Sequence, residues 1–593
     1  MRWLALLLSL QQALWIDVPF VKQDEKGCGS ASIWMVMEYW RPGAAPNVED
    51  IQLQLYSRQV NGIVARDMAR YFETHGYHVF TFRGEWADLE QHVAKGRPLI
   101  VCLEPNARGS PLHYVVVAGV DPIQNLVLVN DPAQRKLLSI SRTEFERGWR
   151  ATENWALLAV PEVDLASTAF RDEKLSEARK HLTSALRANP SDSGTNEFLA
   201  TVYFLQNNTE AALKYWNRAG KPVIENIRID PPLRTDPVLL DRALAFSRGS
   251  FLSLEDFQTS QARLNALRVF SRYQMELSSG SGERFDVTLR AAERNGANLV
   301  SWFRGLPFAT INPEFSNIRG KAINVESLLR WDSNKRRASI SVSAPLKSNP
   351  KWGVGMNIDA RRENWADAGG DFEMRKMQAL AEIRSTPSGR WVWTSGAAIS
   401  SRSFSKALPS GVALKYSGSI TRSLLRDSAR RLNVDSVVAV EAGKLFAANR
   451  LRFAKATSRV SFRWHEITSD LRLGRAIGQI PFDERFILGL DRDSDLWLRG
   501  HSAVLQGRKN AANAAQSYAV TNSDFQKTIH NTGLYRISAG PFLDTGKTSS
   551  TPQWLFDAGI ELRFSILGAF TMNLSYGTSL RDGRHAFFIN APR

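Results

Sequence analysis

The sequence has little of what marks several common protein classes. Only two of its 593 residues are cysteine, Cys28 and Cys102, so a framework of disulfide bonds is excluded. No uninterrupted apolar run reaches the roughly 18 residues that a helix needs to cross a bilayer after the N-terminus. No dense basic stripe or base-reading motif is present, so nucleic acid is not an expected partner. A membrane role would therefore have to use strands.

The positive charge is confined to the second half of the chain. The formal net charge is +17 and the sequence pI is about 9.9. Residues 301–593 hold 42 Lys and Arg against 24 Asp and Glu, whereas residues 1–300 hold 34 against 35. The cations are scattered along alternating segments, a distribution that fits acidic lipid headgroups or a charged pore interior.

The first residues, MRWLALLLSLQQALW, have the outline of a secretory signal peptide. Arg2 precedes a short apolar run, and a small residue, Ala13, follows it. The match is imperfect, because Gln11 stands where a small residue is preferred before a cleavage site. We expect a signal peptide over residues 1–14, with an apolar start of the first domain as the alternative.

Residues 15–161 have the pattern of one compact α+β domain. A helix with Ile33, Val36 and Met37 on one face precedes a second helical segment. The short apolar segments VFTF, LIVCL, YVVVA, LVLV and ALLAV are then expected to be strands.

Residues 165–222 are expected to be helical. Two similar helix ends, SALRANP and WNRAGKP, place Pro190 and Pro222 32 positions apart, near the period of tetratricopeptide repeats. An unspecialised helical hairpin that acts as a spacer is an equally good interpretation.

Residues 223–294 predict the order strand, helix, helix, strand, strand. Asp236 and Pro237 are expected to start the first helix and Gly249 to end it. Ser253 begins a capping-box pattern for the second helix. This order resembles a POTRA domain, the periplasmic module in front of outer-membrane assembly and secretion barrels. A generic packing domain is the alternative.

Residues 295–593 alternate polar and apolar side chains with a period of two. Stretches such as SISVSAP, WGVGMNIDAR, RVSFRW and MNLSYGTSL show this pattern. A transmembrane strand presents one face to lipid and the other to a wet interior, so the pattern favours an antiparallel barrel. A large water-soluble β-sandwich is the competing interpretation.

Several motifs in this part carry a family resemblance. FILGLDRDSDLWLRGH, GPFLDTG, WLFDAGIELRF and HAFFI resemble the BamA-like superfamily of outer-membrane assembly factors and two-partner secretion transporters. The resemblance covers about residues 224–593 and implies a barrel of 16 strands. It also implies that a loop carrying Arg499 and Gly500 folds into the barrel, where the arginine contacts the wall at Phe542 and Asp544. The sequence departs from the family in its Trp-Leu-Arg-Gly-His motif and in its Asn-Ala-Pro-Arg ending, and an exposed loop arginine is the alternative.

The segment QDEKGCGSASIW raises the question whether Cys28 is a nucleophile. A thiol attacks amides as its thiolate, which needs an imidazole, a group that orients the imidazole, and donors for the oxyanion. His113 lies at the entry to one apolar strand and Asp131 at the end of the next, so adjacent strands could bring them together. Gln23 lies just before Cys28, where its amide could bind an oxyanion.

These residues resemble the bacteriocin-processing cysteine peptidases, which are papain-like enzymes that cut leader peptides. DVPFVKQ before the Cys-Gly pair, the HYVVVAG strand and the NDP turn carry the resemblance, over about residues 15–160. It implies that Cys28 attacks, His113 shuttles the proton, Asp131 orients the ring and Gln23 binds the oxyanion. Domains of this type also occur as inactive binders. Cys102, inside an apolar strand, is expected to be buried and not bonded to Cys28.

Together these patterns predict a multidomain protein: a papain-like α+β domain, an all-α spacer, a βααββ POTRA domain and a C-terminal transmembrane antiparallel β-barrel. The expected function is processing of a polypeptide, coupled to its translocation or insertion, at the bacterial outer membrane with the N-terminal domains in the periplasm. Expected partners are the polypeptide substrate, outer-membrane lipid and lipopolysaccharide, and periplasmic accessory proteins; no cofactor or metal is expected. The alternatives are a non-enzymatic insertase or transporter with a peptide-binding module, and a hydrolase displayed through its own barrel.

Overall fold

The computed structural model forms two compact units, residues 1–207 and 208–593. It describes residues 14–24, 26–104, 112–171, 174–279, 284–297, 302, 305–494, 496–532, 535–566 and 570–590. The expected signal peptide lies outside the described residues except for Leu14, which pairs with Val120.

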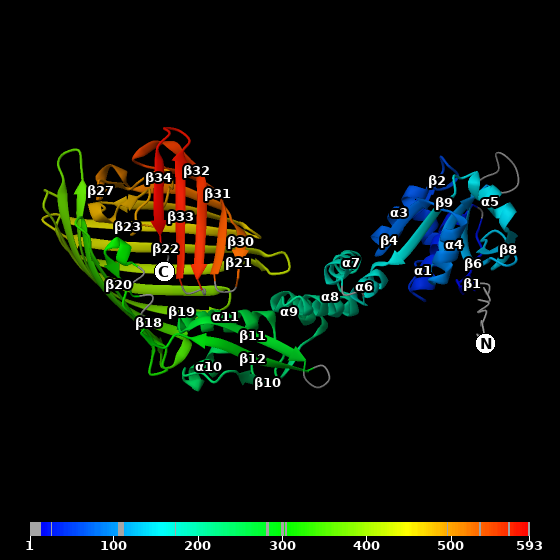
Figure 1. Ribbon diagram of the computed structural model, residues 1–593, viewed down its shortest axis with the longest axis horizontal. Coiled ribbons are helices and arrows are strands. Elements are labelled where there is room, and N and C mark those ends of the chain that lie inside the picture. The colour runs from blue at the N-terminus through cyan, green and yellow to red at the C-terminus, as the bar shows by residue number, and fades with distance from the viewer. Residues whose placement is uncertain are drawn as a thin grey trace, which may run out of the picture. The chain divides into compact units, whose positions relative to one another are not determined.

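A seven-stranded antiparallel sheet forms the centre of the first unit (Figure 1). Its order is β4-β9-β5-β6-β7-β8, and β1 pairs with β6. The apolar segments expected to be strands all lie in this sheet. The strands are β1 (Leu14–Trp15), β4 (Tyr77–Arg83), β5 (Leu99–Leu103), β6 (His113–Asp121), β7 (Leu126–Asn130), β8 (Leu138–Ser141) and β9 (Trp155–Pro161).

Helices cover both faces of this sheet. Successive residues of a strand point to opposite faces, so neighbouring residues pack against different helices. Val116 and Leu157 pack with α1, α2 and α3, whereas their neighbours Val117 and Leu158 pack with α4 and α5. The helices and the short hairpin strands are α1 (Cys28–Trp40), α2 (Val48–Leu55), β2 (Tyr56–Ser57), β3 (Gly62–Ile63), α3 (Ala65–Thr74), α4 (Trp86–Ala94) and α5 (Arg142–Arg150).

Three helices complete the first unit: α6 (Glu162–Arg171), α7 (Leu175–Ala188) and α8 (Ser193–Leu205). α6 begins directly after β9, so it ties the helical part to the sheet. Ala166, Ala178 and Ala200 are fully buried, and their small side chains let the helices approach closely. Within the described ranges, no helix combines the length and apolar character needed to span a membrane.

The second unit begins with α9 (Thr209–Trp216) and the short helix η1 (Asn217–Ala219), followed by a small mixed sheet of order β10-β12-β11. β10 runs parallel to β12, and β11 runs antiparallel to it. Two helices lie between β10 and β11 in the chain. The elements are β10 (Val223–Ile229), α10 (Pro237–Ala243), α11 (Leu254–Leu267), β11 (Phe270–Ser279) and β12 (Arg284–Glu293).

One expected helix boundary in this region is wrong. α10 ends at Ala243 rather than at Gly249. Gly249 has a φ of +78° and donates its backbone N–H to Ile224 O at 2.8 Å, so it shapes the turn that returns the chain to β10. The glycine signal is therefore a turn signal, which the sequence cannot separate from a helix end.

The rest of the second unit is one large sheet that curls into a barrel shape (Figure 1). It contains 20 strand segments in the order from β13 to β34, and β29 and β30 are separated only by residue 526. The sheet amounts to about 16 strands, so the prediction of a large antiparallel barrel-type sheet is confirmed.

Most of the long strands of this sheet are joined by short turns, and a long connection joins β24 to β29. The long strands are β16 (Ile323–Trp331), β17 (Lys335–Leu346), β18 (Asn349–Ala366), β19 (Phe372–Ser388), β20 (Trp391–Phe404), β21 (Gly411–Asp427), β22 (Leu432–Phe446), β23 (Arg450–Trp464), β24 (Ile467–Gly478), β29 (Ser517–Phe525), β30 (Lys527–Asn531), β31 (Tyr535–Thr548), β32 (Thr551–Ile566), β33 (Phe570–Ser579) and β34 (His585–Asn590).

Shorter elements lie at the N-terminal end of this order and in the connection between β24 and β29. They are β13 (Gly296–Ala297), η2 (Leu306–Phe308), β14 (Thr310–Ile311), β15 (Glu314–Ile318), η3 (Phe482–Glu484), β25 (Phe486–Ile487), β26 (Val504–Leu505), β27 (Arg508–Asn510), η4 (Ala511–Asn513) and β28 (Ala514–Ala515).

The two faces of this sheet differ in chemistry. In β18 the apolar side chains of Met356 and Ile358 are 67% and 54% exposed. Asp359, on the opposite face, is buried and forms an ion pair with Arg337 of β17 at 2.6 Å. The same outward exposure of large apolar side chains recurs in β21, β22 and β24, for example at Leu414, Val440 and Leu473.

The connection between β24 and β29 lies inside the curved sheet. Asp483 in this connection forms an ion pair with Lys376 of β19 at 2.9 Å. Arg499, further along the same connection, bonds to Asp544 of β31. A segment that reaches strands so far apart in the sheet must cross its concave side, where the charged side chains gather.

Candidate functional site

Cys28 is the first residue of α1, at the end where backbone N–H groups point away from the helix. The preceding turn is tight: Lys26 has a φ of +62°, and Gly27 N–H donates to Asp24 O at 3.1 Å. A Cβ at Gly29 would come within 2.9 Å of Ile63, so the two glycines flanking Cys28 serve a turn and a close contact. The thiol therefore sits at a fixed, partly exposed helix start.

His113 and Asp131 come together because their strands are neighbours. His113 opens β6, and Asp131 directly follows the last residue of β7, which pairs with β6. His113 Nε2 lies 2.7 Å from Asp131 Oδ1, and both side chains are largely buried. Because Nε2 faces the carboxylate, Nδ1 is the ring nitrogen left for the thiol.

Cys28 and His113 shift each other's pKa. Burial raises the pKa of Cys28, but hydrogen bonding to the His113 side chain and to the Tyr114 backbone, together with the charge of His113, outweighs burial, so its pKa lies below the ordinary value. Burial lowers the pKa of His113, whereas hydrogen bonds to Asp131 and Cys28 raise it, to about 9. The two shifts act in the same direction, since a lowered pKa of Cys28 and a raised pKa of His113 both favour the thiolate–imidazolium pair.

Asp131 is held as a carboxylate by several donors. Burial raises its pKa, but the hydrogen bond from His113, the charge of His113 and the hydrogen bonds from Ala133 and Gln134 together outweigh burial, so the pKa of Asp131 is lowered. Gln134 Nε2 donates to Asp131 Oδ2 at 2.6 Å, and the Ala133 N–H donates to Oδ1 at 2.9 Å. Sequence reasoning did not identify Gln134; its position three residues after the aspartate in an Asx-type turn is the signal that could have found it.

Gln23 lies beside the same turn. Its backbone N–H donates to Pro132 O at 2.9 Å. Its side-chain Oε1 is buried and has no hydrogen-bond partner within the described residues. A buried amide with an unused acceptor is uncommon, and the backbone of Gln23 is held beside the turn that carries Asp131.

Asn130 explains why two separate sequence elements meet here. Its Nδ2 donates to Val18 O at 3.0 Å, and its Oδ1 accepts from the Leu137 N–H at 3.0 Å. This buried amide ties the segment that precedes Cys28 to the end of β7, which carries Asp131. Asn130 was not singled out from the sequence, although it is part of the NDP turn.

Cys102 is buried in β5 and is not bonded to Cys28. Burial, together with the nearby Cys28, raises the pKa of Cys102 to about 12. Its thiol is therefore protonated and unreactive under conditions in which Cys28 is ionised.

The second candidate site is the interior loop of the large sheet. Arg499 binds Asp544 with two parallel bonds, from Nε at 2.9 Å and from Nη2 at 2.6 Å, and its backbone N–H also donates to Asp544 at 2.9 Å. The guanidinium lies 3.7 Å from the centre of the Phe542 ring. Gly500 directly follows Arg499 in the chain, and its backbone N–H donates to Asp557 at 2.6 Å. The structure therefore brings together all four predicted loop and wall residues.

Sequence reasoning missed further carboxylates around Arg499. Its Nη1 lies 2.6 Å from Asp524 and 3.1 Å from Glu561. A Cβ at Gly500 would come within 2.7 Å of Asp557, so the loop passes too close to the wall for a side chain there. The alternation of polar and apolar residues marks Asp524, Asp557 and Glu561 as inward-facing, but it does not indicate with which cationic side chain each of them forms an ion pair.

Comparison with known protein families finds a match in the first part of the chain. Residues 15–157 match the model of the Peptidase_C39 like family, which is the part that contains Cys28, His113, Asp131 and Gln23. No curated protein matches the chain.

Among the solved structures that resemble this chain, three have TM-scores below 0.5. CdiB from Escherichia coli has a TM-score of 0.44 at 14% identity, covering 62% of this chain and 75% of that one. CdiB from Acinetobacter baumannii has a TM-score of 0.39 at 12% identity, with 72% and 86% covered. BamA from Haemophilus ducreyi lacking POTRA domains 1–3 has a TM-score of 0.39 at 12% identity, with 63% and 84% covered.

Proposed function

We propose that this protein is an outer-membrane barrel protein whose N-terminal domain is a cysteine peptidase that cuts a polypeptide as it is translocated or inserted. The observation that carries the enzymatic part is the chain of bonds from Cys28 through His113 to Asp131, at the start of a helix. The match of residues 15–157 to a C39-like peptidase family supports it independently.

In the proposed reaction the Cys28 thiolate attacks the carbonyl carbon of the scissile peptide bond, and the carbonyl oxygen takes the negative charge. The side-chain amide of Gln23 and a backbone N–H at the start of α1 donate hydrogen bonds to this oxyanion. When the C–N bond breaks, the His113 imidazolium gives its proton to the leaving amine, and an acyl-thioester remains. His113 then takes a proton from water, whose oxygen attacks the thioester and releases the second product and the thiolate.

The chemistry of the large sheet supports a membrane location. A continuous outward set of exposed apolar side chains, including Met356, Leu414 and Val440, would be unfavourable in water and is typical of a lipid-facing surface. The opposite face carries the ion pairs of Lys376, Arg402 and Arg499, as expected for a polar barrel interior. We place this barrel in a bacterial outer membrane, in contact with its lipid and lipopolysaccharide, and the N-terminal domains in the periplasm.

The intermediate domains fit this assignment. The mixed sheet β10-β12-β11 with α10 and α11 has the element order of a POTRA domain, and we assign residues 223–294 to one. Helices α6 to α9 occupy the region 165–222, which we assign as a tetratricopeptide-like spacer. Both would offer surfaces to periplasmic accessory proteins.

The proposed function is tested by comparing the N-termini of secreted and outer-membrane proteins in cells that carry the wild-type chain or Cys28→Ala. We expect one or a few polypeptides to keep a leader segment in the variant, while the barrel is still assembled. Cys102→Ala is the matched control and should leave the N-termini unchanged. Identical N-termini in wild type and Cys28→Ala would show that the domain binds peptides without cutting them.

A further inference from the structure

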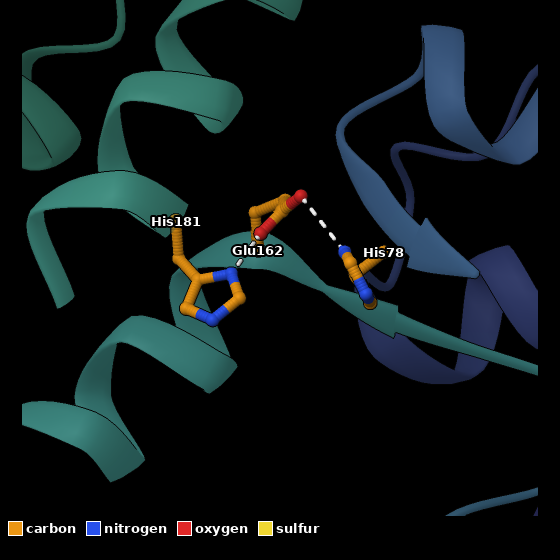
Figure 2. Close-up of side chains that lie close together, drawn as sticks. All are labelled: His78, Glu162 and His181. Atoms are coloured by element: carbon orange, nitrogen blue, oxygen red, sulfur yellow. Dashed lines mark hydrogen bonds and ion pairs between the residues drawn. The ribbon is translucent and has the colours of Figure 1, made fainter. Parts of the chain in front are cut away.

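A second cluster of chemically active side chains lies in the first unit, apart from Cys28. It consists of His78 in β4, Glu162 at the start of α6 and His181 in α7. The Glu162 carboxylate lies between the two imidazoles, with one oxygen facing each ring (Figure 2). His181 Nδ1 is 2.6 Å from Oε2, and His78 Nδ1 is 3.4 Å from Oε1.

This geometry is close to that of a metal site. One ligand atom from each residue can be chosen so that all three lie within 4.8 Å of one another. Tetrahedral zinc with ligand bonds of about 2.0 to 2.2 Å holds its ligand atoms about 3.3 to 3.6 Å apart. The side chain of His78 is 40% exposed, so its ring can turn by the small amount that brings its nitrogen to a ligand distance from the metal.

The donor set selects the kind of metal. Two imidazole nitrogens and one carboxylate oxygen suit zinc, and three protein ligands leave a fourth position open. Glu177, one turn before His181 on α7, has its Oε1 3.9 Å from His181 Nε2, so a second carboxylate lies next to the cluster. Glu162 itself is only 6% exposed, which makes a cation beside it favourable.

Three cationic side chains, Arg179, Lys180 and Arg187, line the same cavity of about 540 Å³. Arg179 is directed elsewhere, because its Nη1 donates to Gln206 at 3.3 Å and its guanidinium lies over the Tyr203 ring. The remaining two would favour an anion, such as hydroxide or a carboxylate, in the open fourth position rather than a second cation.

We propose that His78, Glu162 and His181 form a zinc site that fastens α7 to the peptidase-like domain. The three ligands come from a strand of the sheet, from the first residue of the helix that follows the sheet, and from the next helix. A metal ion held by all three would restrict the movement of α7 relative to β4.

Only neutral histidine is a metal ligand, so zinc competes with protons at the two imidazoles and acid should weaken its binding.

The test uses the full-length chain in detergent micelles, prepared without a histidine tag. Cys28→Ala serves as the background for every sample, because the thiolate and His113 could themselves bind zinc. Zinc is titrated by calorimetry at pH 7.5, and metal content is measured after dialysis. We expect one zinc ion per chain.

Three variants distinguish zinc binding at these three residues from zinc binding elsewhere on the protein. His78→Ala and Glu162→Gln should each weaken zinc binding by at least about 100-fold, which exceeds the usual effect of a second-shell change. His465→Ala removes an exposed histidine in the turn between β23 and β24 and should change nothing. His78 is partly exposed, so its variant keeps the fold even if changes at Glu162 do not.

Hydrogen exchange provides a readout that binding alone does not. Zinc should slow exchange in α7 in the background protein and leave it unchanged in His78→Ala. Absence of zinc binding in the background protein, or equal affinity in all variants, would overturn the site. Binding that does not protect α7 would overturn its proposed fastening role.

Discussion

The guanidinium of Arg499 and the carboxylate of Asp544 form a two-bond ion pair, with Nε 2.9 Å from Oδ2 and Nη2 2.6 Å from Oδ1. Asp544 is fully buried and Arg499 is 4% exposed. The pair joins the interior loop to β31, while Asp524 and Glu561 share the same guanidinium. A single guanidinium thus contacts three acids, and Arg563 supplies a second cation to Glu561.

Arg499→Ala should impair assembly of the barrel, because it leaves these carboxylates without their main partner. Breaking a buried pair from one side commonly costs about 3 to 5 kcal/mol. The measurement is the yield of folded barrel in the membrane and its unfolding midpoint in denaturant. Arg499→Lys keeps the positive charge but cannot form the two parallel bonds of a guanidinium, so its yield of folded barrel should lie between those of the wild type and Arg499→Ala.

Arg450→Ala is the matched control for that experiment, since Arg450 is an exposed residue at the start of β23. It should assemble like the wild type. Normal assembly of Arg499→Ala would show that the interior loop is not anchored by its arginine.

Cys28 should be alkylated much faster than Cys102 near neutral pH. The pKa of Cys28 is lowered by its hydrogen bond to His113, in spite of burial, whereas burial raises the pKa of Cys102 to about 12. Mass spectrometry of iodoacetamide-treated protein measures both rates. His113→Ala should slow the labelling of Cys28 and abolish cleavage; equal rates at the two cysteines would contradict an activated thiol.

Gln23→Ala should lower the turnover of a peptide substrate by about 10²- to 10³-fold, as expected for the loss of one oxyanion donor. Alkylation of Cys28 should stay nearly unchanged, because Gln23 does not set its pKa. Gln124→Ala, in an exposed turn after β6, is the control and should behave like the wild type. A parallel fall in alkylation and turnover would instead assign Gln23 a role in holding the site together.

The pH dependence of kcat/KM should have two limbs. The acid limb reflects protonation of the Cys28 thiolate, and the alkaline limb reflects loss of the His113 proton near pH 9. Asp131→Asn removes the carboxylate that raises the pKa of His113, so the alkaline limb should move to lower pH. An alkaline limb that stays in place in Asp131→Asn would argue against this hydrogen bond as the cause of the shift.

Met356→Arg should destabilise the barrel in a bilayer by about 2 to 4 kcal/mol, because a charge on the lipid-facing side is costly near the membrane centre. The next residue, Asn357, lies on the polar inner face, where its Nδ2 donates to Ser341. Asn357→Arg should therefore have a smaller effect, because the added charge does not face lipid. Folding titrations in lipid vesicles measure both. Equal effects of the two substitutions would contradict the assignment of the outer face.

The sequence alone determined the class of each part of the chain. The period-two alternation after residue 295 predicted the large antiparallel sheet, because a strand with one apolar and one polar face repeats every two residues whatever its partners. Apolar runs such as LIVCL and YVVVA likewise predicted the central strands of the first unit, since both of their faces are covered by helices. The motif positions indicated Cys28, His113 and Asp131 because each lies at the end of such an element.

Only the tertiary structure decided which groups meet and in what charge state. Asp524 and Glu561 come from different strands, and alternation places them inside without showing that they share Arg499. His78 and His181 lie on a strand and a helix far apart in the chain, and they face one carboxylate because α6 begins where β9 ends. The shifts in the pKa of Cys28 and His113 depend on burial and on distances of a few ångströms. Such distances are fixed by the packing of whole elements, so no local sequence pattern contains them.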